Sequence, residues 1–294
     1  MNPLRSVLRD PVEGSGWSVF VNWILRTALA GLMATVLSLT AVPVPVYAQQ
    51  NLFNVPSTTL TPPENIFFQE QLNFTDTGQS NTTFDYGLGG GWEIGMNVLN
   101  ASFYGDFGPT GGVGGNNESV LLNLQRVFNY EETLFLEVGV QAGASVVESQ
   151  RTTEFSSFSW VTGRYHATSG LPGEYVIGIY DGTQTYLGPN HAVGLMIGTE
   201  IPLIPNRLSF VADYISGQTD VSVAVIGFQY TMDPKQGWMI SMGAQIPSPG
   251  SGNPYGVVVE FTKAPVKSPE DTASLLRRRV VPVSNRGQAG QRRF

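Results

Sequence analysis

From residue 66 onward, apolar residues alternate with small or polar ones with a period of two. Side chains on an extended strand point alternately to its two faces, so this period predicts strands and not helices. Turn residues divide this part of the chain into twelve segments, each of roughly the ten residues that a tilted strand needs to cross a bilayer. The predicted strands are Ile66–Thr75, Thr83–Gly89, Trp92–Tyr104, Ser119–Asn129, Thr133–Val147, Phe158–Ala167, Glu174–Asp181, His191–Leu203, Leu208–Ser216, Val221–Met232, Gly237–Ile246 and Tyr255–Lys263.

One face of these segments is apolar, and the other is small and polar. In WEIGMNV, residues 92–98, Trp92 and Ile94 share one face, and Glu93 and Asn97 share the other. A soluble β-sandwich also alternates, but its polar face usually carries Lys, Glu, Thr and Arg, and glycine there weakens a strand. A face of Gly, Gln, Asn and acidic residues fits the crowded wall of a narrow barrel lumen, with the apolar face toward lipid.

The links between segments alternate in length. Odd-numbered links include FGPTGGVGGNNE, ESQRTTEFSS, GTQTYLGPN and PSPGSGNP, and even-numbered links include GG, NYEE, IPNR and DPKQG, whereas GQTD and TSGLPG depart from this pattern. Outer-membrane barrels have short periplasmic turns and longer outer loops. We therefore expect an all-β protein, a transmembrane antiparallel up-and-down barrel of about 12 strands with both ends in the periplasm. A soluble two-sheet protein is the structural alternative.

The N-terminus has the features of an export signal. Arg5, Arg9 and Arg26 precede the apolar run ALAGLMATVLSLTAV, and Val46 and Ala48 are small residues at the positions that a signal peptidase reads. A membrane anchor is the alternative, but the apolar run is shorter than the ~20 residues that a helical span needs. We expect a cleaved signal peptide at 1–48, a periplasmic leader at 49–64, the barrel at 65–263 and a basic periplasmic tail at 264–294.

Composition excludes several classes of protein. Charged residues make up 13% of the chain, about half the usual ~25%, and 34 residues are glycine, which does not suit a disordered or nucleic-acid-binding protein. The absence of cysteine excludes disulfides and thiol chemistry. With only two histidines, His166 and His191, we expect no metal and no cofactor.

Several short motifs resemble a family of bacterial outer-membrane proteins. FDYGLGGGWEIGMNV (84–98), ADYISG (212–217), GFQY (227–230) and NPYGVVVEF (253–261) are similar to those of the porin-like proteins assigned to a phenol-degradation, "MetA-pathway", system, which are loosely related to transporters of hydrophobic compounds. The resemblance covers most of residues 65–263 and implies a passive or diffusive channel. It implies no binding residues, and the basic tail departs from the family pattern.

The alternation places acidic residues from separate strands on the lumen face. Rings of acidic side chains favour cations, so we expect a negative, cation-preferring interior. Pairing of individual acids with a base such as Arg164, or simple contact with a wetted wall, is the alternative. The candidate lumen and selectivity residues are Asp85, Glu93, Glu137, Glu200, Asp213 and Glu260.

Two other interpretations remain open. A lumen-filled structural or adhesion barrel would act through its outer loops. An outer-membrane lipid hydrolase needs a base beside a hydroxyl, and only His166 and Ser169 offer this pair, with different spacing from the His-x-Ser-Asn pattern of such enzymes. We therefore expect no enzyme, and a channel or facilitator for passive diffusion of small solutes.

The C-terminal region suggests two kinds of partner. The final predicted strand, PYGVVVEFTK, is similar to the aromatic-ended strand that the outer-membrane assembly machinery recognises. Residues 263–294 contain 8 basic and 2 acidic residues, whereas residues 49–262 contain 5 basic and 19 acidic residues. The tail is predicted to be a solvated periplasmic end, with contact to anionic lipid or the cell wall as the alternative.

Overall fold

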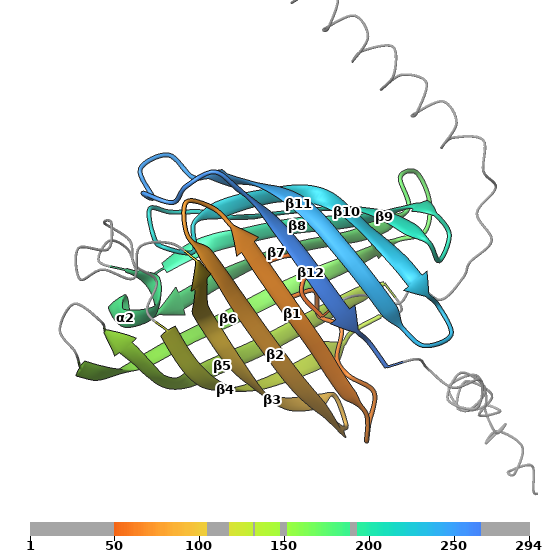
Figure 1. The fold of residues 1–294 in the computed structure, drawn as a ribbon. Helices are drawn as coiled ribbons and strands as arrows, with labels where there is room; N and C mark the ends of the chain where they lie inside the picture. The colour runs from red at the N-terminus through yellow and green to blue at the C-terminus, as the bar shows by residue number, and fades with distance from the viewer. Residues whose placement is uncertain (1–49, 105–117, 132, 148–151, 189–192, 266–294) are drawn as a thin grey trace, which may run out of the picture. The chain divides into compact units, whose positions relative to one another are not determined.

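In the computed structural model, the described residues are 50–104, 118–131, 133–147, 152–188 and 193–265. They form a closed barrel in which each strand pairs antiparallel with its neighbours in the chain, and β1 closes the barrel against β12 (Figure 1). The elements are β1 (Ile66–Phe74), β2 (Gly78–Gly89), β3 (Trp92–Tyr104), β4 (Glu118–Asn129), β5 (Leu134–Val147), β6 (Thr152–Ala167), β7 (Gly173–Gly182), α2 (Gln184–Leu187), β8 (Val193–Ile204), β9 (Leu208–Ile215), β10 (Val223–Asp233), β11 (Trp238–Pro247) and β12 (Gly256–Lys263).

The two faces of the barrel have opposite polarity, and the polar face is inside. Along β5, Val138 and Val140 are exposed, whereas Glu137, Gln141 and Ser145 are buried. The same alternation continues around the barrel, with exposed apolar side chains on the outside and buried polar ones inside. A soluble barrel buries its apolar face, so this arrangement is that of a barrel whose outer surface contacts lipid.

The twelve predicted strands are confirmed, but β2 and β6 begin earlier than the alternation predicted. The sequence at 152–157, TTEFSS, was assigned to a link because of its polar residues. In the structure Thr152–Ser157 pairs with Ala142–Val147 of β5, and the partner strand's hydrogen bonds extend β6. Within the described residues, no helix is both long and apolar enough to cross a membrane.

Short links join the strands at the end of the barrel where β1 begins and β12 ends. The tightest is the β2–β3 turn, where Gly89, Gly90 and Gly91 all have positive φ angles, a conformation that glycine adopts without strain. Near this end, Arg126 lies on the outer face. Its guanidinium packs over the rings of Trp92 and Phe128, which shield the charge at the barrel end.

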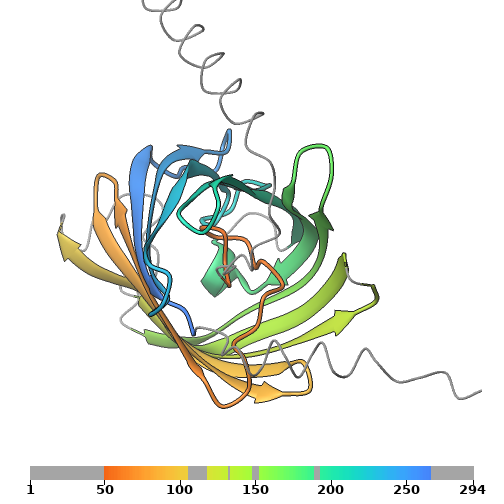
Figure 2. The same ribbon diagram turned by 90° about the vertical axis from the view of Figure 1, so that its right-hand side faces the viewer.

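The interior contains the segment before β1, which the sequence analysis assigned to a periplasmic leader. Figure 2 shows this segment, drawn in orange, inside the ring of strands. Leu52, Phe53 and Val55 are almost fully buried, so residues 50–61 are an internal segment of the barrel and not a free leader, whereas Pro63 and Glu64 are exposed before β1. The predicted signal peptide and most of the basic tail lie outside the described residues.

Candidate functional site: the barrel lumen

All six predicted lumen acids lie on the inner face of the barrel. They come from six different strands, as the alternation predicted, and each is at most 4% exposed. The structure brings only some of them together. These residues are Asp85 (β2), Glu93 (β3), Glu137 (β5), Glu200 (β8), Asp213 (β9) and Glu260 (β12).

The first group contains Asp85, Glu93 and Glu137, which are close enough for their charges to interact. Amide side chains from β4 donate hydrogen bonds to this cluster: Asn123 Nδ2 donates to Asp85 Oδ1 at 2.7 Å, and Gln125 donates to Glu93. The indole Nε1 of Trp160 donates to Glu137 Oε1 at 2.6 Å. These acids are therefore held in fixed positions along the wall formed by β2–β6.

A second group surrounds Arg164. Its Nε lies 3.2 Å from Glu174 Oε2, and Glu200 is near enough to interact with both charges. The sequence analysis named Arg164 as a possible partner for the predicted acids, but its direct ion pair is with Glu174, which was not among them. Glu174 was not predicted because it is the first residue of its predicted strand, where the alternation does not define which face the side chain takes.

Asp213 binds the internal segment. Its Oδ2 accepts hydrogen bonds from three consecutive backbone N–H groups, those of Phe53 at 3.0 Å, Asn54 at 2.5 Å and Val55 at 2.9 Å. Three donors converging on one carboxyl oxygen satisfy backbone groups that would otherwise be buried without partners. Asp213 is thus an anchor for the internal segment, a role that the sequence did not predict.

Glu93 is a second anchor. Its Oε2 accepts hydrogen bonds from Gln50 Nε2, at 2.7 Å, and from the backbone N–H of Thr61, so it joins the two ends of the internal segment. A third contact comes from Arg164, whose Nη1 donates to Thr59 Oγ1 at 2.8 Å. The backbone at Thr58 also lies against Glu137.

Glycines of the inner wall make room for the internal segment. A Cβ atom on Gly198 would lie 2.1 Å from Leu52 Cδ1, and one on Gly243 would lie 2.9 Å from the Phe53 ring. At Gly87, a Cβ would lie 2.2 Å from the carbonyl oxygen of Pro62. These glycines explain part of the small-residue face that the sequence analysis attributed to a crowded lumen.

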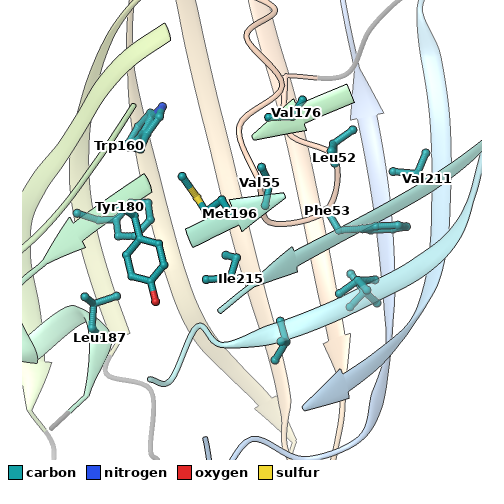
Figure 3. Close-up of a cluster of buried hydrophobic side chains, with 14 residues drawn as sticks. Leu52, Phe53, Val55, Trp160, Val176, Tyr180, Leu187, Met196, Val211 and Ile215 are labelled. Atoms are coloured by element: carbon teal, nitrogen blue, oxygen red, sulfur yellow. The ribbon is translucent and has the colours of Figure 1, made fainter. Parts of the chain in front are cut away.

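An apolar cluster fills the interior on the side of β6–β10 (Figure 3). Leu52, Phe53 and Val55 of the internal segment pack into it together with side chains of the inner wall. The other members are Leu187 of α2 and the inner-wall residues Phe158, Trp160, Val176, Tyr180, Met196, Val211, Ile215, Val223, Val225 and Val258. The interior therefore has an apolar side, which receives the segment, and a polar side along β2–β5.

A short helix in the β7–β8 link borders this cluster. The ring of Tyr186 in α2 stacks on Phe158 with the ring centroids 5.0 Å apart, and its hydroxyl accepts a hydrogen bond from Gln141 Nε2 at 2.7 Å. Burial raises the pKa of the Tyr186 phenol above its ordinary value, so this hydroxyl stays protonated. Tyr186 thus joins the apolar side of the interior to the polar side.

The pair considered for lipid hydrolysis is not assembled. His166 Nδ1 lies 2.7 Å from Glu174 Oε1, and Ser169 is exposed in the β6–β7 link. Among the described residues, no hydrogen bond joins the side chains of His166 and Ser169. The same residues contain no cluster of three or more potential metal ligands. His191 lies outside the described residues.

Comparison with known proteins gives weak similarities only. No protein-family model matches the chain, and no curated protein matches it. Among solved structures, the chain is similar to the KdgM porin in complex with disordered oligogalacturonate, with a TM-score of 0.47 and 8% identity over 67% of this chain and 98% of that chain. The KdgM porin alone gives a TM-score of 0.46 and 8% identity, with the same coverage of both chains.

A third similar structure is the outer membrane channel DcaP of Acinetobacter baumannii, with a TM-score of 0.32 and 14% identity over 68% of this chain and 71% of that chain. These identities and scores give no evidence of a shared family or substrate. The fold and the lumen therefore have to be interpreted from the chain itself.

Proposed function

We propose that this protein is an outer-membrane channel or facilitator through which small solutes diffuse passively. The inverted polarity of the barrel supports this proposal most directly. Apolar side chains such as Leu122 and Ile177, each 65% exposed, lie on the outside, while acids and amides line the inside. A polar inner face is typical of transmembrane barrels that hold a water-filled path.

The location follows from the barrel type. Closed barrels with an even number of strands and short turns at one end are typical of bacterial outer membranes. Both ends of the described barrel lie at the short-link end, which supports a periplasmic location for them. The predicted signal peptide supplies export, and β12, with Val257, Val259 and Phe261 on one face, suits recognition by the assembly machinery.

The solute path runs along the polar wall of β2–β5 and prefers cations. Asp85, Glu93 and Glu137 lie together there, and Arg164 is the one basic residue among the buried side chains of the described chain. A negative wall of this kind concentrates cations and repels anions.

Larger acidic solutes fit this wall poorly. Oligogalacturonate, which the similar KdgM porin holds, is a chain of acidic sugars, so we do not assign it to this protein. Neutral or cationic small molecules agree better with the charge of the lumen. The resemblance to the phenol-degradation family is consistent with uncharged aromatic solutes and remains part of the proposal.

Conductance of the refolded protein in planar bilayers tests the proposal. With asymmetric KCl, we expect discrete openings whose reversal potential indicates preference for K⁺. Neutralising one acid of the β2–β5 wall, Asp85→Asn, whose carboxyl group accepts a hydrogen bond from Asn123 of β4, is expected to reduce that preference. Asp76→Asn in the exposed β1–β2 link is the matched control and is expected to leave the reversal potential unchanged.

One observation favours a second candidate function. Residues 50–61 occupy part of the lumen, as a structural or adhesion barrel with a filled interior would require. Such a barrel would be silent in bilayers, and its function would lie in the outer loops. Folded, inserted protein that shows no conductance with or without residues 50–61 would favour this second candidate.

A further inference from the structure

We infer that the inner wall of β8–β11 is a binding site for the chain's own residues 50–57, and that residues 50–61 form a displaceable plug in the channel. This inference rests on the proposed channel function and goes beyond it, because it assigns a gate and the contacts that hold it. It is based on the match between the segment and the wall. The match involves backbone groups, side chains, and glycines that leave space for side chains of the segment.

The segment forms a compact unit before it contacts the wall. The backbone N–H of Leu52 donates to the carbonyl oxygen of Val55 at 2.9 Å, and that of Ser57 donates to Gln50 at 2.7 Å. Asn51 and Pro56 form a bridge across this turn. The turn therefore satisfies several of its own backbone groups and can leave the wall as one piece.

The wall recognises this turn through a defined pattern. Asp213 binds the three N–H groups at its tip, and Gly198 and Gly243 leave hollows for Leu52 and Phe53. A side chain at either glycine would collide with the segment. These are the features of a binding site with a single matching occupant, namely residues 50–57.

The barrel does not need the segment to close. Each strand pairs with two neighbouring strands, and β1 pairs with both β2 and β12. Near β2, the segment contacts the barrel backbone where the N–H of Glu64 donates to Gly87 at 2.9 Å and the N–H of Gly87 donates to Asn65 at 3.2 Å. Residues 50–61 can therefore be released while 62–65 stay attached as a hinge.

Release of the plug changes the lumen at the acids. Glu93 binds both Gln50 and Thr61, so the inserted segment occupies one acid of the proposed path and lies against Glu137. When the segment leaves, these carboxyl groups become available to a solute. The same motion thus widens the path and uncovers its negative wall.

A deletion tests the inference. A variant that lacks only residues 50–61 keeps the signal region, Pro62–Asn65 and all strands. We expect its single-channel conductance or open probability to be at least several-fold higher than that of the unaltered protein. A synthetic peptide of residues 50–64, added to the side that faces the short links, is expected to lower the current of the deletion variant again. A scrambled peptide is the control and is expected to have no effect.

A cross-link tests the same inference without a deletion. The chain contains no cysteine, so Leu52→Cys with Gly198→Cys provides the only thiol pair for a short bifunctional reagent. Cross-linked protein is expected to stay in the low-conductance state and to recover its openings when the link is cleaved. The Leu52→Cys single variant, treated with the same reagent, controls for simple modification, and the double variant without reagent controls for the side chain added at position 198.

The outcomes separate the plug from the channel. If the folded deletion variant conducts no better than the unaltered protein, and the cross-link leaves the openings unchanged, residues 50–61 are not a gate, although the channel function stands. If neither protein conducts although both are folded and inserted, the channel function fails and the plug inference fails with it. Insertion is verified by heat-modifiable migration in gels.

Discussion

Substitution of Asp213 by alanine is expected to release the internal segment while the barrel remains intact. The carboxyl group accepts hydrogen bonds from three backbone N–H groups of the segment, and no other residue of the described chain accepts a hydrogen bond from these groups. Each bond contributes about 1 kcal/mol, so the loss of three weakens the inserted state by roughly 3 kcal/mol. This corresponds to about a hundredfold shift toward the released state.

Two assays follow this shift. In planar bilayers, Asp213→Ala is expected to show a much higher open probability than the unaltered protein. In detergent, limited proteolysis is expected to cut residues 50–61 of the variant faster, because a released segment reaches the protease. Asp213→Asn keeps one carbonyl oxygen as an acceptor, so we expect an intermediate result in both assays.

The matched control separates loss of the anchor from loss of a lumen charge. Glu200→Gln removes a buried acid of the same inner wall whose side-chain hydrogen bond is with Ser209 of β9 and not with the segment. If Asp213→Ala and Glu200→Gln have the same open probability, or if Asp213→Ala leaves proteolysis unchanged, the hydrogen bonds to Asp213 do not hold the segment and the reasoning is refuted.

Three further predictions follow from single positions. Gly87→Val places a side chain against Pro62, so we expect higher open probability, whereas Gly163→Ala, whose Cβ meets nothing nearer than 3.9 Å, is expected to have no effect in the same bilayer recording. Ile177→Arg on the lipid face, at the middle of β7, is expected to destabilise the barrel by about 2–4 kcal/mol in urea titrations from lipid vesicles; unchanged stability would contradict a lipid-facing surface. Burial raises the pKa of Asp220, in the β9–β10 link, so its charged form destabilises that link as the pH rises above the ordinary value of 3.8. Asp220→Asn is therefore expected to slow hydrogen exchange in the link at neutral pH but not below pH 3.8, and equal exchange at neutral pH would count against this.

The strands and the polarity of their faces were predictable because they depend on neighbouring residues. The alternation around Trp92 and Glu93 is visible in the sequence, and the structure places Glu93 inside and Trp92 outside. The same parity placed all six acids on the inner wall. The role of these acids in ion preference stays a prediction, because it depends on whether the lumen is open as well as on which face of the strand each acid occupies.

The internal segment was not predictable from local pattern. Residues 50–64 are polar and contain several prolines, which is also the composition of a linker. Their partners lie far away in the sequence: Phe53 is 160 residues from Asp213, and Thr61 is 32 residues from Glu93. The glycines at 198 and 243 were visible as small inner-face residues, but only the folded chain shows which side chains fill the space above them.

The most direct test of the central claim is single-channel recording of the refolded protein beside the variant lacking residues 50–61, in asymmetric KCl. We predict cation-selective openings from both proteins, with larger or more frequent openings from the variant. The absence of openings from both, when each is folded and inserted, would contradict the account and leave a closed structural barrel as the explanation of the fold.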